Sequence, residues 1–221
     1  MHSASEEDYL KAIYKLTPKD APINTNSIAD TLATKASSVT DMIKKLAEKK
    51  LVNYVKYQGV TLTETGKKVA VLVIRKHRLW ETFLVEKLNF TWDEIHEVAE
   101  QLEHIKSTKL IDRLDELLGH PKHDPHGDPI PDKLGKFKRS DEVPLNQLNE
   151  GTRSVLHGVN DDSAEFLQYL DRLPIVLGSQ IQILEKFSFD ESMKIKINQD
   201  KEIHISATVA ANLSVSKSAD E

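Results

Sequence analysis

The chain has 221 residues, of which 39% are hydrophobic and 29% charged, and its formal net charge is −5 at pH 7. This composition is ordinary for a globular protein, and no apolar run approaches the roughly 18 residues of a membrane-spanning helix. The absence of cysteine excludes disulfides, zinc–thiolate sites, iron–sulfur clusters and thiol catalysis. Because MHSASEEDYL also lacks the features of a signal peptide, we expect a soluble cytoplasmic protein.

The charge is unevenly distributed along the chain. Residues 1–75 hold 12 Lys/Arg against 8 Asp/Glu, a balance of +4, whereas the remaining 146 residues hold 18 against 27, a balance of −9. A basic N-terminal third suggests a surface that binds nucleic acid, joined to an acidic part with a different task.

The N-terminal part has the pattern of a winged helix-turn-helix. A helix is expected over 6–17, a short helix from Asn24 or Thr25, and a third helix over 36–50. The stretch LVNYVKYQGVTLTETG, residues 51–66, alternates apolar and polar residues around a Gln58-Gly59 turn, which is typical of a β-hairpin. Three helices followed by a hairpin predict a winged helix-turn-helix.

Residues 64–118 are expected to be helical throughout, with a long helix over 64–88, a second over 91–105 and a third that starts at Ser107. The Pro/Gly/Asp-rich stretch HPKHDPHGDPIPDKLG, residues 120–135, is interpreted as a linker. Beyond residue 141, the stretches 175–187, 192–199 and 201–210 alternate apolar and polar residues, which predicts a small β-barrel or sandwich. One short helix is expected within 161–173, and the tail SKSADE, residues 216–221, is expected to be disordered.

The stretch HEVAEQLEH, residues 96–104, is rich in metal-ligand side chains. Successive helical residues lie about 100° apart, so His96, Glu100, Glu103 and His104 would share an arc of roughly 100° beside the apolar stripe. On the preceding helix, His77 and Glu81 lie one turn apart within an apolar stripe, where they must be paired, neutralised or metal-bound. These residues therefore predict metal binding; the alternative is solvated charges or Glu–His pairs within one helix.

The ligand-rich stretch does not match a catalytic signature. HEVAE lacks the second histidine of the HExxH motif, and EQLEH lacks the first histidine of the inverted motif. A sensing site is therefore favoured over a catalytic one, and we expect no enzymatic activity. Two alternatives stay open: a metal-dependent enzyme with the winged helix as its scaffold, and a small-molecule-responsive winged-helix regulator with a structural acidic cluster.

The motifs EDYLKAIYKL, SSVTDMIKKL, YQGVTLTETGKK, RKHRLWETFL and HEVAEQLEH together resemble the diphtheria toxin repressor and manganese transport regulator family. HGDPIP and the β-rich C-terminal part resemble the three-domain members. The resemblance implies a dimeric transcriptional regulator activated by a divalent metal, usually a repressor of metal-uptake genes. It implies a mainly α fold with β, made of a winged helix-turn-helix over 1–71, a helical dimerisation and metal-binding domain with linker over 72–139, and an SH3-like β-barrel with tail over 140–221.

The resemblance also implies the ligands. Asp8, Glu100, Glu103 and His104 would form one metal site, and a bound cation would tie the first helix of the DNA-binding domain to the helical domain. A neighbouring site would use His77, Glu81 and His96, to which Glu165 and Gln168 in AEFLQYLD have the spacing to contribute; a solvated helix face is the alternative for this pair.

The identity of the expected metal is judged from two positions at which this chain differs from known members of the family. Iron-responsive members have Met and Cys where this chain has Asp8 and Glu100, and carboxylates favour a harder ion, so Mn²⁺ is expected with Fe²⁺ second. Manganese-responsive two-domain members have Glu where this chain has Lys11, which cannot ligate while protonated. It is therefore in question whether this chain can arrange a pair of ions in the way those two-domain members do.

The recognition helix is expected to begin near Ser37 and to meet an inverted-repeat operator in double-stranded DNA as part of a homodimer. N-capping is the alternative role for the serines. The residues expected to contact base edges or phosphates are Ser37, Ser38, Thr40, Lys44, Lys45, Thr25 and Asn26, with Lys56 and Tyr57 at the wing.

Two further expectations concern the helical segment and the linker. The helical segment has more apolar residues than one helix pair needs to bury, which favours a dimer interface over an intramolecular core alone. The linker histidines His120, His123 and His126 could form a third metal site, but exposed polar residues suit an irregular loop better. The apolar residues of the predicted interface are Leu72, Val73, Trp80, Phe83, Leu110, Ile111 and Leu114.

Overall fold

The computed structural model describes residues 2–17, 21–56, 58–91, 94–137, 142–161 and 163–217. The chain divides into two compact units. The first contains Met1–Trp80, Ala99–Gly119 and Ile130–Phe137, and the second contains Glu81–Val98, His120–Pro129 and Lys138–Glu221. Two of the limits between the units, after Trp80 and after Val98, fall within helices, and the domain boundaries expected from the sequence stay a prediction.

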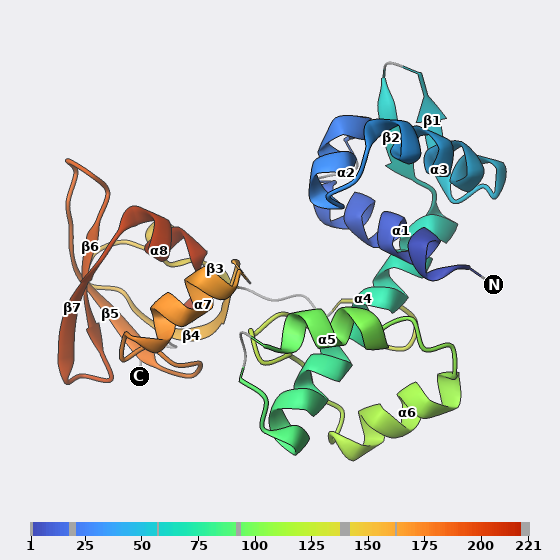
Figure 1. Cartoon of the computed structure of the whole chain (residues 1–221). Coiled ribbons are helices and arrows are strands. Elements are labelled where there is room, and N and C mark those ends of the chain that lie inside the picture. The colour runs from blue at the N-terminus through green and yellow to red at the C-terminus, as the bar shows by residue number, and fades with distance from the viewer. Residues whose placement is uncertain are drawn as a thin grey trace. The chain divides into compact units, whose positions relative to one another are not determined.

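The first unit begins with the predicted winged helix-turn-helix (Figure 1). Helices α1 (Ala4–Leu16), α2 (Thr25–Thr31) and α3 (Ala36–Glu48) are followed by strands β1 (Val52–Val55) and β2 (Gly59–Leu62). The two strands pair antiparallel from Val52↔Leu62 to Val55↔Gly59. Gly59 has a φ of 112°, a conformation that an L side chain rarely adopts, so the hairpin turn depends on this glycine.

Short polar side chains set the starts of these helices. Ser3 and Glu6 form a capping box at α1, and Asn24 Oδ1 accepts a hydrogen bond of 2.8 Å from the Ser27 backbone N–H at α2. At α3 the N-cap residue is Lys35, which makes no side-chain cap bond. Ser37 and Ser38 lie inside α3, so N-capping is the wrong alternative for these serines.

One hydrophobic core holds the winged helix together. Each helix contributes the apolar positions that recur every three or four residues, and each strand contributes one face. Its buried residues include Leu10, Ile13, Ile28, Val39, Ile43, Leu46, Leu51 and Val60.

The helical segment follows the hairpin. Helix α4 spans Glu64–Leu88, as predicted, and α6 spans Thr108–Leu117 with Ser107 as its N-cap. Helix α5 spans only Ile95–Leu102 and is shorter than the predicted 91–105, so Glu103 and His104 lie in the turn that follows it. In the described part of the chain, no helix is both long and apolar enough to cross a membrane.

Residues 130–137, which we call the strap, form an ordered segment of the first unit rather than a loose linker. Arg75 donates a hydrogen bond of 2.6 Å to the Pro131 carbonyl and forms an ion pair of 3.0 Å with Asp115. At the end of the strap, the Phe137 ring stacks on Tyr14 of α1 at a centroid distance of 6.4 Å. The strap is thus fixed to α4 at one end and to the winged helix at the other.

The second unit contains the predicted small β domain, a six-stranded sheet with strand order β3-β8-β4-β5-β6-β7. The strands are β3 (Val143–Pro144), β4 (Arg153–Val159), β5 (Gln180–Lys186), β6 (Met193–Ile197), β7 (Lys201–Ile205) and β8 (Leu213–Lys217), all paired antiparallel. A short 3-10 helix, η2 (Leu145–Gln147), follows β3. The buried core of this sheet includes Leu145, Leu156, Leu167, Ile183, Ile195, Leu213 and Val215.

Two details of this domain differ from the sequence-based expectation. The alternating stretch 201–210 is a strand only as far as Ile205, because Ser206 accepts a hydrogen bond from the Val209 N–H and starts helix α8 (Ala207–Asn212). Ser216 and Lys217 belong to β8 rather than to a disordered tail, and the prediction for 218–221 lies outside the described residues. The predicted short helix is α7 (Ala164–Asp171).

The loop 120–129 is held against β4 in the second unit. The Val159 N–H donates to the His126 carbonyl at 2.9 Å, and a Cβ added to Gly127 would lie 1.8 Å from the His157 carbonyl oxygen. Only glycine permits this approach. Asp124 Oδ1 accepts hydrogen bonds from the backbone N–H groups of His126 and Asp128, which fixes the turn.

Candidate metal centre and nucleic-acid interface

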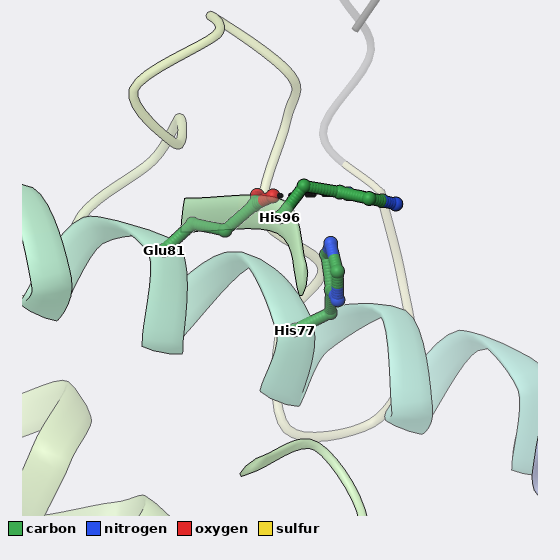
Figure 2. A group of neighbouring side chains, drawn as sticks. All are labelled: His77, Glu81 and His96. Carbon is green, nitrogen blue, oxygen red and sulfur yellow. Dashed lines mark ion pairs between the residues drawn. The ribbon is translucent and has the colours of Figure 1, made fainter. Parts of the chain in front are cut away.

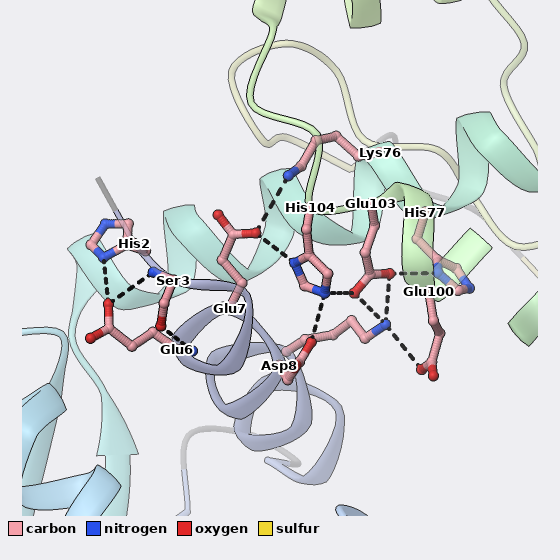
Figure 3. Close-up of polar contacts among 11 residues, drawn as sticks. His2, Ser3, Glu6, Glu7, Asp8, Lys76, His77, Glu100, Glu103 and His104 are labelled. Atoms are coloured by element: carbon pink, nitrogen blue, oxygen red, sulfur yellow. Dashed lines mark hydrogen bonds and ion pairs between the residues drawn. The ribbon is translucent and has the colours of Figure 1, made fainter. Parts of the chain in front are cut away.

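Three predicted ligands meet between α1 and the turn after α5, all within the first unit. Oxygen or nitrogen atoms of Asp8, Glu103 and His104 lie within 4.8 Å of one another. Figure 3 shows His104 between the carboxylates of α1 and Glu103. His104 Nε2 lies 2.9 Å from Asp8 Oδ1 and 3.8 Å from Glu103 Oε1. Residues distant in the sequence thus form one potential cation site.

Glu103 is the buried centre of this group, with a relative exposure of 0%. His77 Nδ1 lies 2.6 Å from its Oε2, and Lys11 Nζ lies 2.7 Å from each carboxylate oxygen. Burial alone would raise the pKa of Glu103, but the His77 hydrogen bond and the Lys11 charge outweigh it and hold the pKa below its usual value. Glu103 is therefore a carboxylate that a cation can bind.

The other members of the group are closer to solvent. The Glu100 side chain is 52% exposed, and its Oε1 lies 3.4 Å from Lys11 Nζ. Burial raises the pKa of Asp8, partly offset by the charge of His104. Glu7 was not predicted as a site residue, yet its Oε2 lies 2.8 Å from His104 Nδ1 and 3.7 Å from Lys76 Nζ. The signal for Glu7 is the run Glu6-Glu7-Asp8, but its spacing does not reveal which carboxylate faces the histidine.

This donor set fits a divalent cation. The donors are carboxylate oxygens and an imidazole nitrogen, which suit Mn²⁺ and several other divalent ions. Among the described residues, Glu103 Oε1 is buried and meets no hydrogen-bond criterion, and the group nearest to it is the Lys11 ammonium at 2.7 Å. A buried carboxylate oxygen of this kind needs a cation beside it.

Glu81 is the centre of a second group. Its side chain is 3% exposed, and His96 Nδ1 lies 3.6 Å from its Oε1 within the second unit. Figure 2 shows His77 and Glu81 leaving α4 on successive turns, with the His96 side chain beside Glu81. His77 and Glu81 are both buried, as the apolar stripe predicted, and His77 forms a hydrogen bond with the Glu103 carboxylate of the first group.

The loop 120–129 adds two residues to the surroundings of Glu81. Ligand atoms of Glu81, Asp124 and His126 lie within 4.8 Å of one another, and all three residues are buried. The expectation of exposed polar residues holds for His120 and His123 but is wrong for His126, which is 4% exposed. Neither Asp124 nor the Glu81–His126 proximity could be read from the irregular loop sequence.

Glu165 and Gln168 are both exposed on α7. In the part of the chain that the structure describes, Glu165 is not in any of the three carboxylate and histidine groups. The contribution of this pair to a metal site stays a prediction.

The predicted DNA-contacting residues lie mostly on the surface of α2 and α3. Ser37, Ser38 and Asn26 are exposed, whereas Thr25 and Thr40 are partly buried. The Lys44 side chain is 60% exposed, 3.6 Å from Asp41. Lys45 is instead bound to the buried Glu6 at 2.9 Å, so its charge has an internal partner. Lys56 is exposed, and Tyr57 lies outside the described residues.

Part of the predicted dimer surface is buried within a single chain. Val73, Trp80, Ile111 and Leu114 are each at most 8% exposed, so the intramolecular-core alternative applies to these four residues. Leu110 is 42% exposed, and Leu72 and Phe83 are partly exposed. A groove of about 390 Å³ in the first unit is lined by apolar residues such as Leu72, Ile105 and Ile111 together with charged residues such as Glu7 and Lys76.

Comparisons with known proteins agree with this architecture. Residues 1–60 match the family model of the iron-dependent repressor N-terminal DNA-binding domain, and residues 63–132 match that of the iron-dependent repressor metal-binding and dimerisation domain. Residues 143–217 match the FeoA domain.

Individual relatives agree with these matches. The chain is 34% identical over 150 residues to the HTH-type transcriptional regulator MntR of Oceanobacillus iheyensis, covering 68% of this chain and 97% of that protein. It is 33% identical over 148 residues to the iron-dependent repressor IdeR of Mycobacterium bovis, covering 65% of this chain and 64% of that protein. A manganese-dependent transcriptional repressor solved in complex with manganese has a TM-score of 0.86 at 33% identity, with 96% of this chain and 99% of that chain covered.

A winged helix, a helical segment carrying carboxylate–histidine groups and a small β domain define a metal-dependent DNA-binding regulator. The chain belongs to the family of the diphtheria toxin repressor and the manganese transport regulator, as its motifs suggested. It combines the DNA-binding domain and the metal-binding and dimerisation domain of that family with a C-terminal FeoA domain of SH3-like fold.

Proposed function

We propose that this protein is a Mn²⁺-activated repressor of metal-uptake genes, with Fe²⁺ as the second-choice effector. It acts in the cytoplasm as a homodimer on an inverted-repeat operator, and it catalyses no reaction. The observation that carries the proposal is the distance of 2.9 Å between Asp8 on α1 and His104 after α5. Oxygen and nitrogen donors from the DNA-binding domain and the helical domain meet at this point.

The proposed ligands fall into two sets. Asp8, Glu100, Glu103 and His104 hold the first ion, and His77, Glu81 and His96 hold a second, with Glu165 and Gln168 as further donors. The proximity of Asp124 and His126 to Glu81 supports these two residues as additional donors. The domain limits that go with this proposal are 1–71, 72–139 and 140–221.

Manganese is supported by chemistry and by the relatives. Asp8 and Glu100 are hard oxygen donors, and no thiolate is present in the chain to favour a softer ion. Similar proteins include a manganese-dependent repressor solved with manganese and the manganese regulator SloR. The iron-dependent repressor IdeR is also similar, which keeps Fe²⁺ as the second choice.

Control of DNA binding then follows from where the residues lie. Asp8 belongs to α1, which packs against α2 and β2, and α2 in turn packs against α3, while Glu103 and His104 follow α5. Asp8, Glu103 and His104 would hold the cation, which would supply positive charge at the point where these three side chains converge. Asp8 thereby holds α1, and with it the recognition helix α3, in one orientation relative to the helical domain.

DNA recognition is assigned to the exposed side of α3. Ser37, Ser38 and Thr40 meet base edges and phosphates, and Lys44 meets the backbone. Thr25, Asn26, Lys45, Lys56 and Tyr57 are the remaining proposed contacts. Two copies of the chain, joined through exposed apolar residues such as Leu72 and Leu110, place their α3 helices in successive major grooves about one turn apart.

Metal titration of DNA binding tests this function. Operator-containing DNA is titrated with the full-length protein in the presence of Mn²⁺, Fe²⁺, Co²⁺, Zn²⁺ or a chelator. We expect tight binding with Mn²⁺, weaker activation by Fe²⁺, and only salt-sensitive non-specific binding with the chelator. Equal operator affinity with and without metal would exclude metal activation and favour a regulator that is controlled by another ligand. Metal-dependent turnover of a substrate would favour the enzyme alternative.

A further inference from the structure

Lys11 places a positive charge inside the proposed first metal site. Its Nζ lies 2.7 Å from both carboxylate oxygens of Glu103 and 3.4 Å from Glu100 Oε1, and its side chain is only 8% exposed. Glu103 and Glu100 are the same carboxylates that are proposed to hold the metal ion. The ammonium group therefore occupies the place of a cation.

Lys11 also joins the same two parts of the chain as the proposed metal. It lies on α1, three residues after Asp8, so both side chains project from the same side of that helix. Glu103 follows α5 and is fully buried. The Lys11–Glu103 ion pair consequently holds α1 against the helical segment.

If the Lys11 charge is removed, His77 is the hydrogen-bond partner of Glu103 that remains among the described residues. A buried carboxylate that loses a charged partner is costly, because few other groups replace its hydration. Lys11 thus stabilises the metal-free protein.

This arrangement, which rests on the proposed metal-activated function, implies competition between two cations. An ammonium nitrogen and a divalent cation cannot both lie within about 3 Å of the same two carboxylate oxygens without strong repulsion. We propose that Lys11 is a built-in competitor for the metal. Its ammonium group neutralises Glu103 in the metal-free protein and must leave this carboxylate when the ion binds, so Lys11 sets the metal concentration at which the protein responds.

The side chain has a route by which to leave. Lysine has a flexible four-carbon stem, and the Glu100 side chain beside its ammonium is 52% exposed, so the ammonium can turn past Glu100 into solvent. Displacement therefore needs a rotamer change of Lys11 rather than a movement of α1. The free energy of breaking the Lys11–Glu103 pair is subtracted from the free energy of metal binding.

Replacement of Lys11 by Met tests the competition in the full-length protein. Met retains an unbranched side chain of similar length but removes the charge. Mn²⁺ affinity is measured by isothermal titration calorimetry without DNA, and thermal unfolding is followed with a chelator and with saturating Mn²⁺. We expect Lys11→Met to bind Mn²⁺ at least about tenfold more tightly, because a close positive charge has been removed. We also expect it to melt at a lower temperature than the wild type only when metal is absent.

Control variants separate competition from a general charge effect. Lys15→Met removes one charge from an exposed position of the same helix and should leave Mn²⁺ affinity unchanged. Lys11→Gln keeps a hydrogen-bond donor for Glu103 and provides the measurement if Lys11→Met does not fold without metal. A purely structural role for Lys11 would lower the melting temperature without strengthening metal binding.

The outcomes distinguish this inference from the proposed function. If wild-type protein binds no Mn²⁺ at all, the proposed function fails. If wild type binds Mn²⁺ but Lys11→Met and Lys11→Gln bind it equally or more weakly, the competition by Lys11 is refuted and the metal-activated function stands.

Discussion

His104 lies between two carboxylates of α1, with its Nε2 atom 2.9 Å from Asp8 and its Nδ1 atom 2.8 Å from Glu7. The imidazole is thus oriented by one carboxylate while its other nitrogen faces the proposed ligand Asp8. Second partners of this kind fix the ring of a metal-binding histidine and strengthen it as a ligand.

Asp8→Ala should uncouple metal binding from DNA binding. The variant removes the proposed ligand from α1 while Glu103 and His104 remain. We expect the Mn²⁺ concentration needed for half-maximal DNA binding to rise by roughly 5- to 150-fold, the usual range of coupling between two sites. The measurement is fluorescence anisotropy of labelled operator DNA during a Mn²⁺ titration, and an unchanged Mn²⁺ dependence would refute the bridging role of Asp8.

Lys44→Ala and Lys45→Ala should differ, although the sequence presents the two lysines alike. Lys44 is exposed, so its loss should weaken binding to all DNA sequences and reduce the slope of log affinity against log salt by about one. Lys45 is bound to the buried Glu6, so its loss should mainly lower protein stability. Salt titrations and chemical unfolding of both variants check this, and a base-specific effect of Lys44→Ala would contradict a phosphate contact.

Glu6 should contribute stability that depends on pH. Burial raises its pKa, but hydrogen bonds from Lys49 and Lys45 outweigh this and lower the pKa from its ordinary value of 4.5 to about 2. The stabilisation is therefore fully present above pH 4.5 and is lost as the pH falls through about 2.

Glu6→Gln should lower the free energy of unfolding at pH 7 by about 2 kcal/mol, and the difference from wild type should shrink between pH 4.5 and 2. Urea unfolding at several pH values in the presence of a chelator provides the measurement. Glu202→Gln, which breaks the exposed Lys194–Glu202 pair, is the matched control and should have little effect. A Glu6→Gln effect that persists undiminished at pH 2 would contradict this assignment.

Arg75→Met should destabilise the attachment of the strap. The substitution leaves Asp115 as a buried carboxylate without its guanidinium and removes the donor to the Pro131 carbonyl. We expect a loss of about 3–5 kcal/mol in the free energy of unfolding of the first unit. The double variant Arg75→Met/Asp115→Leu should recover part of it, and equal losses in single and double variants would show that the ion pair is not the cause.

His126→Ala tests the surroundings of Glu81. If His126 donates to a second ion, the variant should bind fewer equivalents of Mn²⁺ than the wild type, as His96→Ala should. Replacement of the exposed His120 serves as the control. Metal content measured after equilibrium dialysis decides this, and full occupancy in His126→Ala would limit the second set to the residues predicted from the sequence.

The fold was largely predictable because its elements have strong local signals. The apolar periodicity of 64–88 predicted α4 from end to end. Ser107 predicted the start of α6, and Asn24, one of the two candidates with Thr25, is the N-cap of α2. Helix α8 was missed because its residues continue the alternation of β7, and only the Ser206 cap marks the change.

The site was predictable in part, because periodicity reveals the face of a helix but not the partner of that face. The apolar stripe correctly placed His77 and Glu81 in the interior, but it could not show that His77 pairs with Glu103. Asp8 and His104 are far apart in the sequence, and no local pattern connects them; the family resemblance brought them together. His126 is buried through backbone contacts with β4, which the composition of a Pro/Gly loop does not reveal.

The strap is attached to the winged helix through a contact that does not involve any proposed metal ligand. Phe137 stacks on Tyr14 without any of the residues of the acidic group, so this contact does not require a bound ion. The winged helix and the strap are therefore expected to stay joined in protein that holds no metal.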